Sequence, residues 1–150
     1  MRGLVDVIAE ILPKDTARLV RAFRRRRFQV AEEDIEDALV ERGHFSVFDE
    51  ASEYRLDCRG AYTDFERLAL AERRRVRIDR SFVYIDSPAN LIVAKLAFGS
   101  EQDILDAEAV YARQRPHLDL RQVAARARDR GVLREWKDLQ GRVDAVLDAE

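Results

Sequence analysis

The stretch from Ser87 to Tyr111 constrains the fold most, because its residues predict two helices joined by a tight turn. Ser87 suits an N-cap, since its hydroxyl can accept from an amide two or three residues on, and Pro88 suits the first helical position. Gly99 ends the first helix, because glycine adopts the left-handed conformation without a steric cost. Ser100, with an acid three residues later, begins the second helix in the manner of a capping box.

Lys95 falls on the inward face of the first of these helices. The apolar positions on that face are Leu91, Ile92 and Phe98. An unpaired charge in a core is very costly, so we expect Lys95 to pair with Asp103 or Asp106, just past the turn. Two roles stay open: an ion pair that locks the two helices together, or a lysine that reaches into a phosphate site from the edge of the core.

Composition excludes several classes of protein. The 150 residues fit one domain with a substantial core. Charged residues make up 37%, but the net charge of −2 gives no general attraction to nucleic acid. The single cysteine, Cys58, excludes an internal disulfide and fits a reducing compartment. No apolar run approaches the ~18 residues of a membrane span, and no secretory signal precedes the first strand. We therefore expect a cytoplasmic protein without a membrane partner.

Two clusters of arginine interrupt the chain, Arg24–Arg27 and Arg73–Arg77. An RNA or phosphate contact is one interpretation. A solvated surface is favoured, because the chain as a whole is not basic and cations also suit a helix C-terminus. Nucleic acid is therefore not expected as a partner, although it is not excluded. The two histidines, His44 and His117, lie far apart without a zinc-binding spacing.

The remaining patterns predict an α/β (α+β) fold in one domain, with a small mixed β-sheet in residues 1–86 and a helical part in 87–150. In order, we expect a strand at 4–12, a helix before the first arginine cluster, a short strand at 28–30, and a helix from Glu32 that Gly43 ends. A hairpin at 45–58 follows, then a helix from Thr63 to about Arg74, a hairpin at 76–85, and four helices. Trp136 on the last helix is expected to be a core or interface anchor.

Alternation in the first hairpin places one carboxylate on a defined face. Leu56 and Cys58 alternate along its second strand, so Arg55, Asp57 and Arg59 lie on the opposite face. One interpretation is a charge ladder with cross-strand partners. The other is a carboxylate displayed for chemistry.

Three stretches resemble the nucleotidyltransferase-fold proteins of the minimal nucleotidyltransferase and AbiEii-like kind, some of which are components of toxin–antitoxin systems. The stretches are VDVIAEILPKD, RGHFSVFDEASEYRLDCR and SPANLIVAKLAFGSEQDILDAEAVY. The resemblance covers most of the chain. It implies a metal-dependent transfer of a nucleotide from a nucleoside triphosphate, with carboxylates that hold two divalent metals such as Mg²⁺.

Residue by residue, the resemblance assigns Asp6 to the second carboxylate of an Asp-x-Asp pair and Asp57 to the third. Both are therefore expected as catalytic residues and metal ligands, and Lys95 as a residue near the phosphates. Leu4 stands where the first carboxylate belongs, and a leucine cannot bind a metal. The Gly-Ser turn that would cradle the triphosphate has no counterpart either. We therefore expect a catalytically impaired protein.

Two explanations fit this departure: a degenerate or truncated protein, or a true start that lies upstream. The alternative function is a non-catalytic interaction protein of a toxin–antitoxin type, which binds a toxin-like partner or a second copy of itself. Apolar positions around Trp136 and an open sheet edge are candidate surfaces for that function.

Overall fold

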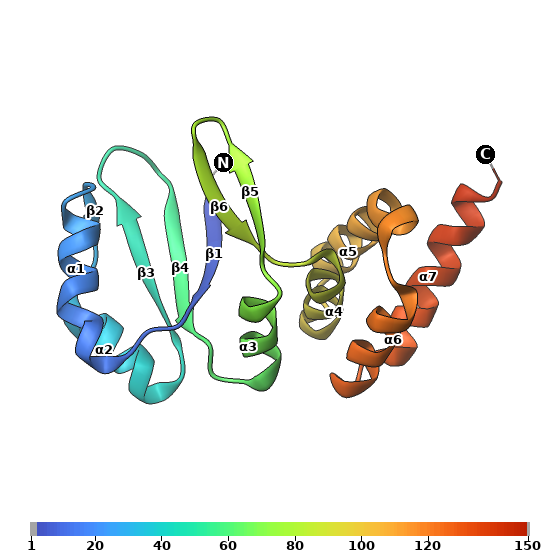
Figure 1. Ribbon diagram of the computed structural model, residues 1–150, viewed down its shortest axis with the longest axis horizontal. Coiled ribbons are helices and arrows are strands. Elements are labelled where there is room, and N and C mark those ends of the chain that lie inside the picture. The colour runs from blue at the N-terminus through green and yellow to red at the C-terminus, as the bar shows by residue number, and fades with distance from the viewer. Residues whose placement is uncertain (1–2, 150) are drawn as a thin grey trace. The chain divides into compact units, whose positions relative to one another are not determined.

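The computed structural model describes residues 3–149, and the chain divides into two compact units (Figure 1). Unit 1 comprises Met1–Ala71 and unit 2 comprises Glu72–Glu150. The fold class is confirmed as mixed α/β. The sequence places the internal boundary between residues 86 and 87, whereas contacts place it after Ala71, so the second hairpin groups with the helices.

Unit 1 is a four-stranded mixed sheet whose first two helices cover one face. Its elements are β1 Leu4–Ala9, the 3₁₀ turn η1 Pro13–Asp15, α1 Thr16–Arg24, β2 Phe28–Gln29, α2 Glu32–Glu41, β3 His44–Asp49, β4 Arg55–Gly60 and α3 Asp64–Ala71. The strand order is β1-β4-β3-β2. β1 runs parallel to β4, and the other two pairs are antiparallel.

The core of unit 1 follows from the spacing of its apolar residues, which recur at every second position in the strands and at helical spacing in α1 and α2. Its fully buried members are Val20, Val30, Ile35, Ala38, Phe45, Val47 and Cys58. The strand residues among them point to one face of the sheet, and α1 and α2 pack their apolar stripes against it. Burying one such side chain contributes about 1.5–3 kcal/mol, so this face holds the unit together.

Two helix ends in unit 1 differ from the prediction. Arg42, not Gly43, takes the left-handed conformation at the end of α2, with φ of 56°. Its guanidinium donates to the carbonyl oxygen of Tyr62 at 2.6 Å, a tertiary contact that offsets the backbone cost. The helix from Thr63 ends at Ala71 rather than near Arg74.

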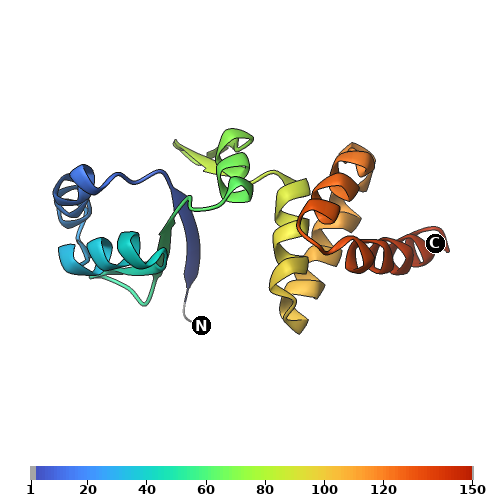
Figure 2. The ribbon, with the colours of Figure 1, turned by 90° about the horizontal axis from the view of Figure 1, so that it is seen from below.

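Unit 2 is a two-stranded hairpin followed by a helical bundle. Its elements are β5 Arg74–Ile78, β6 Ser81–Ile85, α4 Pro88–Phe98, α5 Glu101–Gln114, the 3₁₀ turn η2 Arg115–His117, α6 Leu120–Asp129 and α7 Leu133–Leu147. α4 and α5 lie side by side (Figure 2). Their core continues into α6 and α7. There the ring of Tyr111 on α5 packs edge-to-face on that of Trp136 on α7, with 5.1 Å between the ring centroids.

The local signals in the helix pair are confirmed. Ser87 accepts from the Asn90 amide, Gly99 has φ of 71°, and Ser100 forms its capping box with Asp103. The expected inward face is wrong in one position, because Phe98 is largely exposed. The buried residues of α4 are instead Ala89, Asn90, Ile92, Val93 and Leu96.

Trp136 is buried in the core of unit 2, so it offers no surface to a partner. Among the described residues, no helix combines the length and apolar character that a membrane crossing needs.

Candidate functional site

The sheet of unit 1 has a second face that α1 and α2 do not cover, which we call the open face. Its residues are Leu4, Asp6 and Ile8 of β1, Arg55, Asp57 and Arg59 of β4, and His44, Ser46 and Phe48 of β3. They alternate with the core residues of the same strands. Polar side chains therefore gather on this face, as the alternation in the first hairpin predicted.

Asp6 and Asp57 are register partners in the parallel pair of β1 and β4. Residues opposite one another in neighbouring strands share a face, and the strands lie about 4.8 Å apart. Asp6 is exposed, and the side chain of Asp57 is 16% exposed. The resemblance assigned these two carboxylates to one site, and the register places the two residues opposite one another.

Two neighbours fix the carboxylate of Asp57. The Ser46 hydroxyl, opposite it on β3, donates to Oδ1 at 2.7 Å. The Arg55 guanidinium donates to Oδ2 at 3.1 Å. Each carboxylate oxygen accepts two hydrogen bonds or ligands, so both oxygens keep a position for a cation. Ser46 was not predicted from the sequence, although the register set by the turn between β3 and β4 identifies it.

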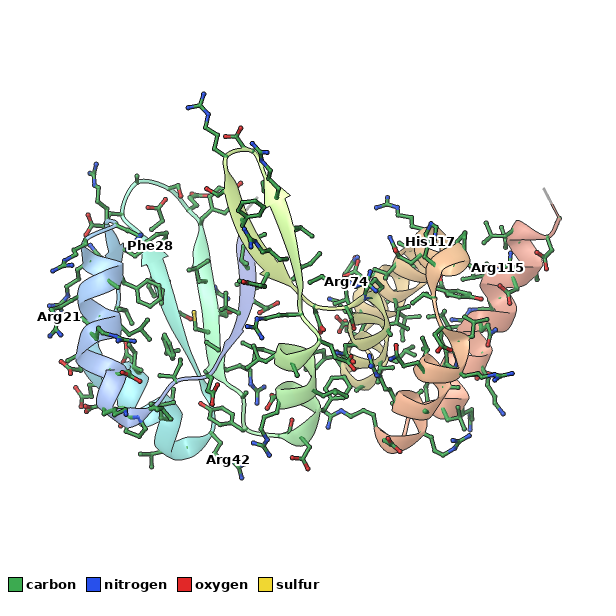
Figure 3. All side chains as sticks on the ribbon, in the orientation of Figure 1. Arg21, Phe28, Arg42, Arg74, Arg115 and His117 are labelled. Atoms are coloured by element: carbon green, nitrogen blue, oxygen red, sulfur yellow. The ribbon has the colours of Figure 1, made fainter. Side chains whose placement is uncertain are left out.

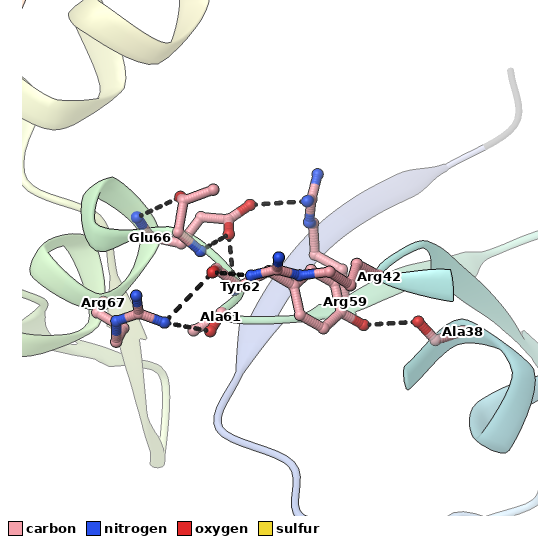
Figure 4. Close-up of polar contacts among 8 residues, drawn as sticks. Ala38, Arg42, Arg59, Ala61, Tyr62, Glu66 and Arg67 are labelled. Carbon is pink, nitrogen blue, oxygen red and sulfur yellow. Dashed lines mark hydrogen bonds and ion pairs between the residues drawn. The ribbon is translucent and has the colours of Figure 1, made fainter. Parts of the chain in front are cut away.

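Arg59 does not flank Asp57 in the same way, because Glu66 of α3 holds its guanidinium at 2.8 Å (Figure 4). Glu66 also closes the capping box of α3 by accepting from the amides of Tyr62 and Thr63, both at 2.8 Å. Burial alone raises the pKa of Glu66, but these hydrogen bonds outweigh it and lower the pKa below its usual value. The Tyr62 hydroxyl donates to the carbonyl of Ala38, which ties this corner to α2.

Leu4 lies two residues before Asp6 and so shares the open face. It is 49% exposed and pairs in register with Arg55. This is the position at which the resemblance implied a first carboxylate. The described residues contain no group of three or more metal-binding side chains. The donor set here is therefore two carboxylates, which fits one Mg²⁺ that keeps several water or phosphate ligands.

Cys58 lies behind Asp57 on the core face. Burial, followed by the charge of Asp57, raises the pKa of its thiol to about 11. The thiol is therefore protonated near neutral pH and is neither a nucleophile nor a metal ligand of the open face.

Lys95 lies in unit 2, where its ammonium contacts Asp103 at 2.9 Å and Asp106 at 3.1 Å. The expected ion pair is confirmed, with both candidate partners. Asp103, then Asp106, raise the pKa of Lys95 against the opposing effect of burial. The Ser100 hydroxyl and then Lys95 lower the pKa of Asp103. The contacts match the helix-locking role, and the cofactor-binding role of Lys95 stays a prediction.

A second polar cluster lies inside unit 2 and was not anticipated. The guanidinium of Arg126 on α6 is 8% exposed; it donates to Asn90 Oδ1 at 2.6 Å and forms an ion pair with Glu72. Nearby, burial raises the pKa of Asp86, although the Asn90 side chain and the Ser87 amide oppose the shift. Nothing in the local pattern of α6 distinguishes Arg126 from its exposed neighbours, except its helical spacing from the buried Val123 and Ala127.

Comparison with known proteins gave no match, either to a protein-family model or to a curated protein.

Proposed function

We propose that this chain is a nucleotidyltransferase-like protein in which Asp6 and Asp57 together hold a divalent cation with a nucleoside triphosphate. The register that sets these two carboxylates side by side on one exposed face carries the proposal. Ser46 and Arg55 support it, because they orient Asp57 and leave a ligand position on each oxygen. The cation, when bound, would neutralise charge on the phosphates and activate a nucleophile.

The same arrangement limits catalysis. A two-metal transfer needs a carboxylate between the ions, and the residue in that position of the face is Leu4. Two carboxylates suit a single Mg²⁺, which suffices to bind a triphosphate but not to steady both the attacking and the leaving oxygen. We therefore propose binding of Mg²⁺ with a nucleoside triphosphate, and poor nucleotide transfer.

Calorimetric titration with Mg²⁺ and ATP tests the binding. We expect saturable binding that Asp57→Asn abolishes and that Ser46→Ala weakens by about tenfold, because it releases the orientation of Asp57. Asp64→Asn is the matched control, since Asp64 is a fully exposed carboxylate on α3 that pairs only with Arg67. Absence of binding at millimolar ATP, or equal binding by the Asp57 and Asp64 variants, would refute the proposal.

Leu4→Asp makes a sharper test, because it places a third carboxylate on the same face without disturbing the core. Leu4 is half exposed, so the exchange leaves the fold intact. We expect tighter Mg²⁺ binding and the appearance of Mg²⁺-dependent transfer of a labelled nucleotide to protein or RNA. A Leu4→Asn variant controls for polarity without charge. If Leu4→Asp binds Mg²⁺ no better than Leu4→Asn, the open face is not a metal site.

A second candidate function rests on β1. This six-residue strand forms one border of the sheet, and no strand within residues 3–149 pairs with its outer edge. Leu4 and Val5 are both half exposed there. Unpaired strand edges pair with other chains, so self-association or a toxin-like protein partner is the alternative that this edge favours. Light scattering after size exclusion tests it: a dimer that Val5→Lys dissociates supports self-association, whereas a wild-type monomer contradicts it.

A further inference from the structure

The β5–β6 hairpin of unit 2 concentrates positive charge that the chain as a whole lacks. Residues 73–85 contain five arginines and one acid, Asp79, whereas the whole protein has a formal net charge of −2. The arginines are Arg73, Arg74, Arg75, Arg77 and Arg80. All five are exposed, and the hairpin extends away from the helices of its unit, with Arg74 at its base (Figure 3).

Two aromatic rings share a face of the hairpin with part of this charge. Arg75 pairs in register with Tyr84, and Arg77 with Phe82, so these four side chains form what we call the basic–aromatic face. The opposite face is apolar and consists of Val76, Ile78, Val83 and Ile85, with Arg74 and Ser81 at its ends. The alternation therefore separates a face of aliphatic side chains from one of arginines and aromatic rings.

Both aromatic rings of the basic–aromatic face carry a stacked guanidinium, one from Arg75 of the face and one from the neighbouring Arg73. The Arg75 guanidinium lies 3.9 Å from the centroid of the Phe82 ring, and the Arg73 guanidinium lies 4.8 Å from that of Tyr84. Phe82 and Tyr84 nevertheless remain 55% and 60% exposed. Within residues 3–149, neither Arg75 nor Arg77 forms an ion pair with a carboxylate. Arg75 and Arg77 thus present cations, beside exposed π-surfaces, that no carboxylate among the described residues neutralises.

We propose that the basic–aromatic face binds single-stranded nucleic acid, independently of the function proposed for the open face. Guanidinium groups bind phosphates, and both guanidinium planes and aromatic rings stack on unpaired bases. Stacking on Phe82 holds Arg75 in place, and a hydrogen bond to the Asp79 carbonyl oxygen holds Arg77, before a strand arrives, which lowers the entropy lost on binding. The arginine count alone favours a solvated surface. The two exposed rings on the same face distinguish the hairpin from such a surface. An acidic protein partner would bind the arginines but would not stack on the rings, whereas unpaired bases do both.

Fluorescence anisotropy with a labelled oligouridylate, an oligothymidylate and a duplex of equal length tests the proposal on the full chain. We expect a dissociation constant of about 10⁻⁵ M at low salt for the single strands, with affinity falling as salt rises, by a slope of about −0.7 per phosphate contacted. Tighter binding of the oligouridylate would identify RNA as the ligand. Equal binding of the two oligonucleotides would mean that the face binds single-stranded RNA and DNA alike. Binding of the duplex as tight as that of the single strands overturns the proposal, because stacking needs unpaired bases.

Variants separate the charge from the rings. Arg75→Glu/Arg77→Glu should reduce affinity at least tenfold and flatten the salt slope, while Arg121→Glu/Arg134→Glu, with the same change of charge at exposed positions on α6 and α7, should change it far less. Equal losses in the two double variants would reduce the effect to net charge and contradict the proposal.

The aromatic arm uses Tyr84→Ala against Tyr84→Phe. Loss of one stacking ring weakens binding by about fivefold or more, and phenylalanine preserves the ring. Should the alanine variant unfold by circular dichroism, Tyr84→Leu replaces it, since leucine keeps the apolar bulk without a π-face. Full affinity in a folded variant without the ring would refute base stacking, and no binding of either single strand by the wild-type protein would refute the site.

Discussion

Replacing Arg126 by methionine tests whether its buried cluster stabilises unit 2. Methionine retains most of the aliphatic stem and removes the charge. The substitution leaves Asn90 Oδ1 buried without its donor, which costs about 1–3 kcal/mol. It also leaves Glu72 without its cation. Breaking a fully buried pair costs roughly 3–5 kcal/mol, but the Glu72 side chain is 33% exposed and regains water. We therefore expect Arg126→Met to lower the free energy of unfolding by about 2–3 kcal/mol, which is less than breaking a fully buried pair would cost.

Urea unfolding followed by tryptophan fluorescence measures this loss. Trp136 is the only tryptophan, it is buried, and it lies in the same unit as Arg126. With a urea dependence of about 2 kcal/mol per molar, the midpoint should fall by roughly 1–1.5 M. Arg142→Met is the matched control, because the ion pair of Arg142 with Glu108 at 2.7 Å is more exposed and should be worth at most about 1 kcal/mol.

The double variant Arg126→Met/Glu72→Gln isolates the stranded carboxylate. If the unpaired charge on Glu72 is a substantial part of the cost, the double variant recovers part of the stability lost in Arg126→Met. Equal midpoints for Arg126→Met and Arg142→Met would refute the reasoning, since burial of the guanidinium would then have no energetic consequence.

Three further perturbations concern groups with shifted pKa values or a half-buried ion pair. Burial raises the pKa of Asp86 in the folded state above its unfolded value, so the folded state loses stability as the pH rises from the unfolded pKa to the folded pKa. Asp86→Asn should therefore raise the urea midpoint at pH 7 and leave it unchanged at pH 3, where the carboxyl is protonated in both states. The raised pKa of Lys95 means that its pair stabilises the fold below the unfolded pKa of 10.5 and that this contribution is lost above the folded pKa. Lys95→Met should lower the midpoint by less than a fully buried pair would, and the difference from wild type should disappear at strongly alkaline pH. The thiol of Cys58, with a pKa of about 11, should react with a disulfide reagent at pH 8 far more slowly in the folded protein than in urea, as absorbance of the released thiolate reports.

Signals confined to a few neighbouring residues were readable from the sequence. The caps at Ser87 and Ser100 and the left-handed Gly99 depend only on side chains within one turn, so local chemistry determines them. The same holds for the capping box of Thr63 and Glu66. The pairing of Lys95 was also predictable, because its partners follow directly after the turn.

Features that depend on distant contacts were not readable. Arg42 replaces Gly43 as the left-handed residue because its guanidinium reaches Tyr62, which lies on another element. Periodicity placed Phe98 inward, but this last residue of α4 is 72% exposed, two residues after the buried Leu96. Arg126 resembles the exposed arginines around it in sequence, and only the fold places Glu72 and Asn90 beside it.

The candidate site on the open face was predictable in part. Alternation gave the face of Asp57, and the family resemblance pointed to Asp6. Their direct opposition depends on the parallel register of β1 with β4, which no local pattern specifies. Ser46 follows from the antiparallel register with β4, which a turn of known length fixes within the hairpin.

The parallel pairing of β1 with β4 also has a consequence during synthesis. β1 is made before β4, and this partner strand is completed only after the intervening helices and β3 have been translated. At about 5–20 residues per second, the nascent strand waits several seconds for a partner. Throughout that interval both backbone edges of β1 are accessible to chaperones and to other nascent chains, so β1 is the strand of this sheet that is most exposed to mispairing during synthesis.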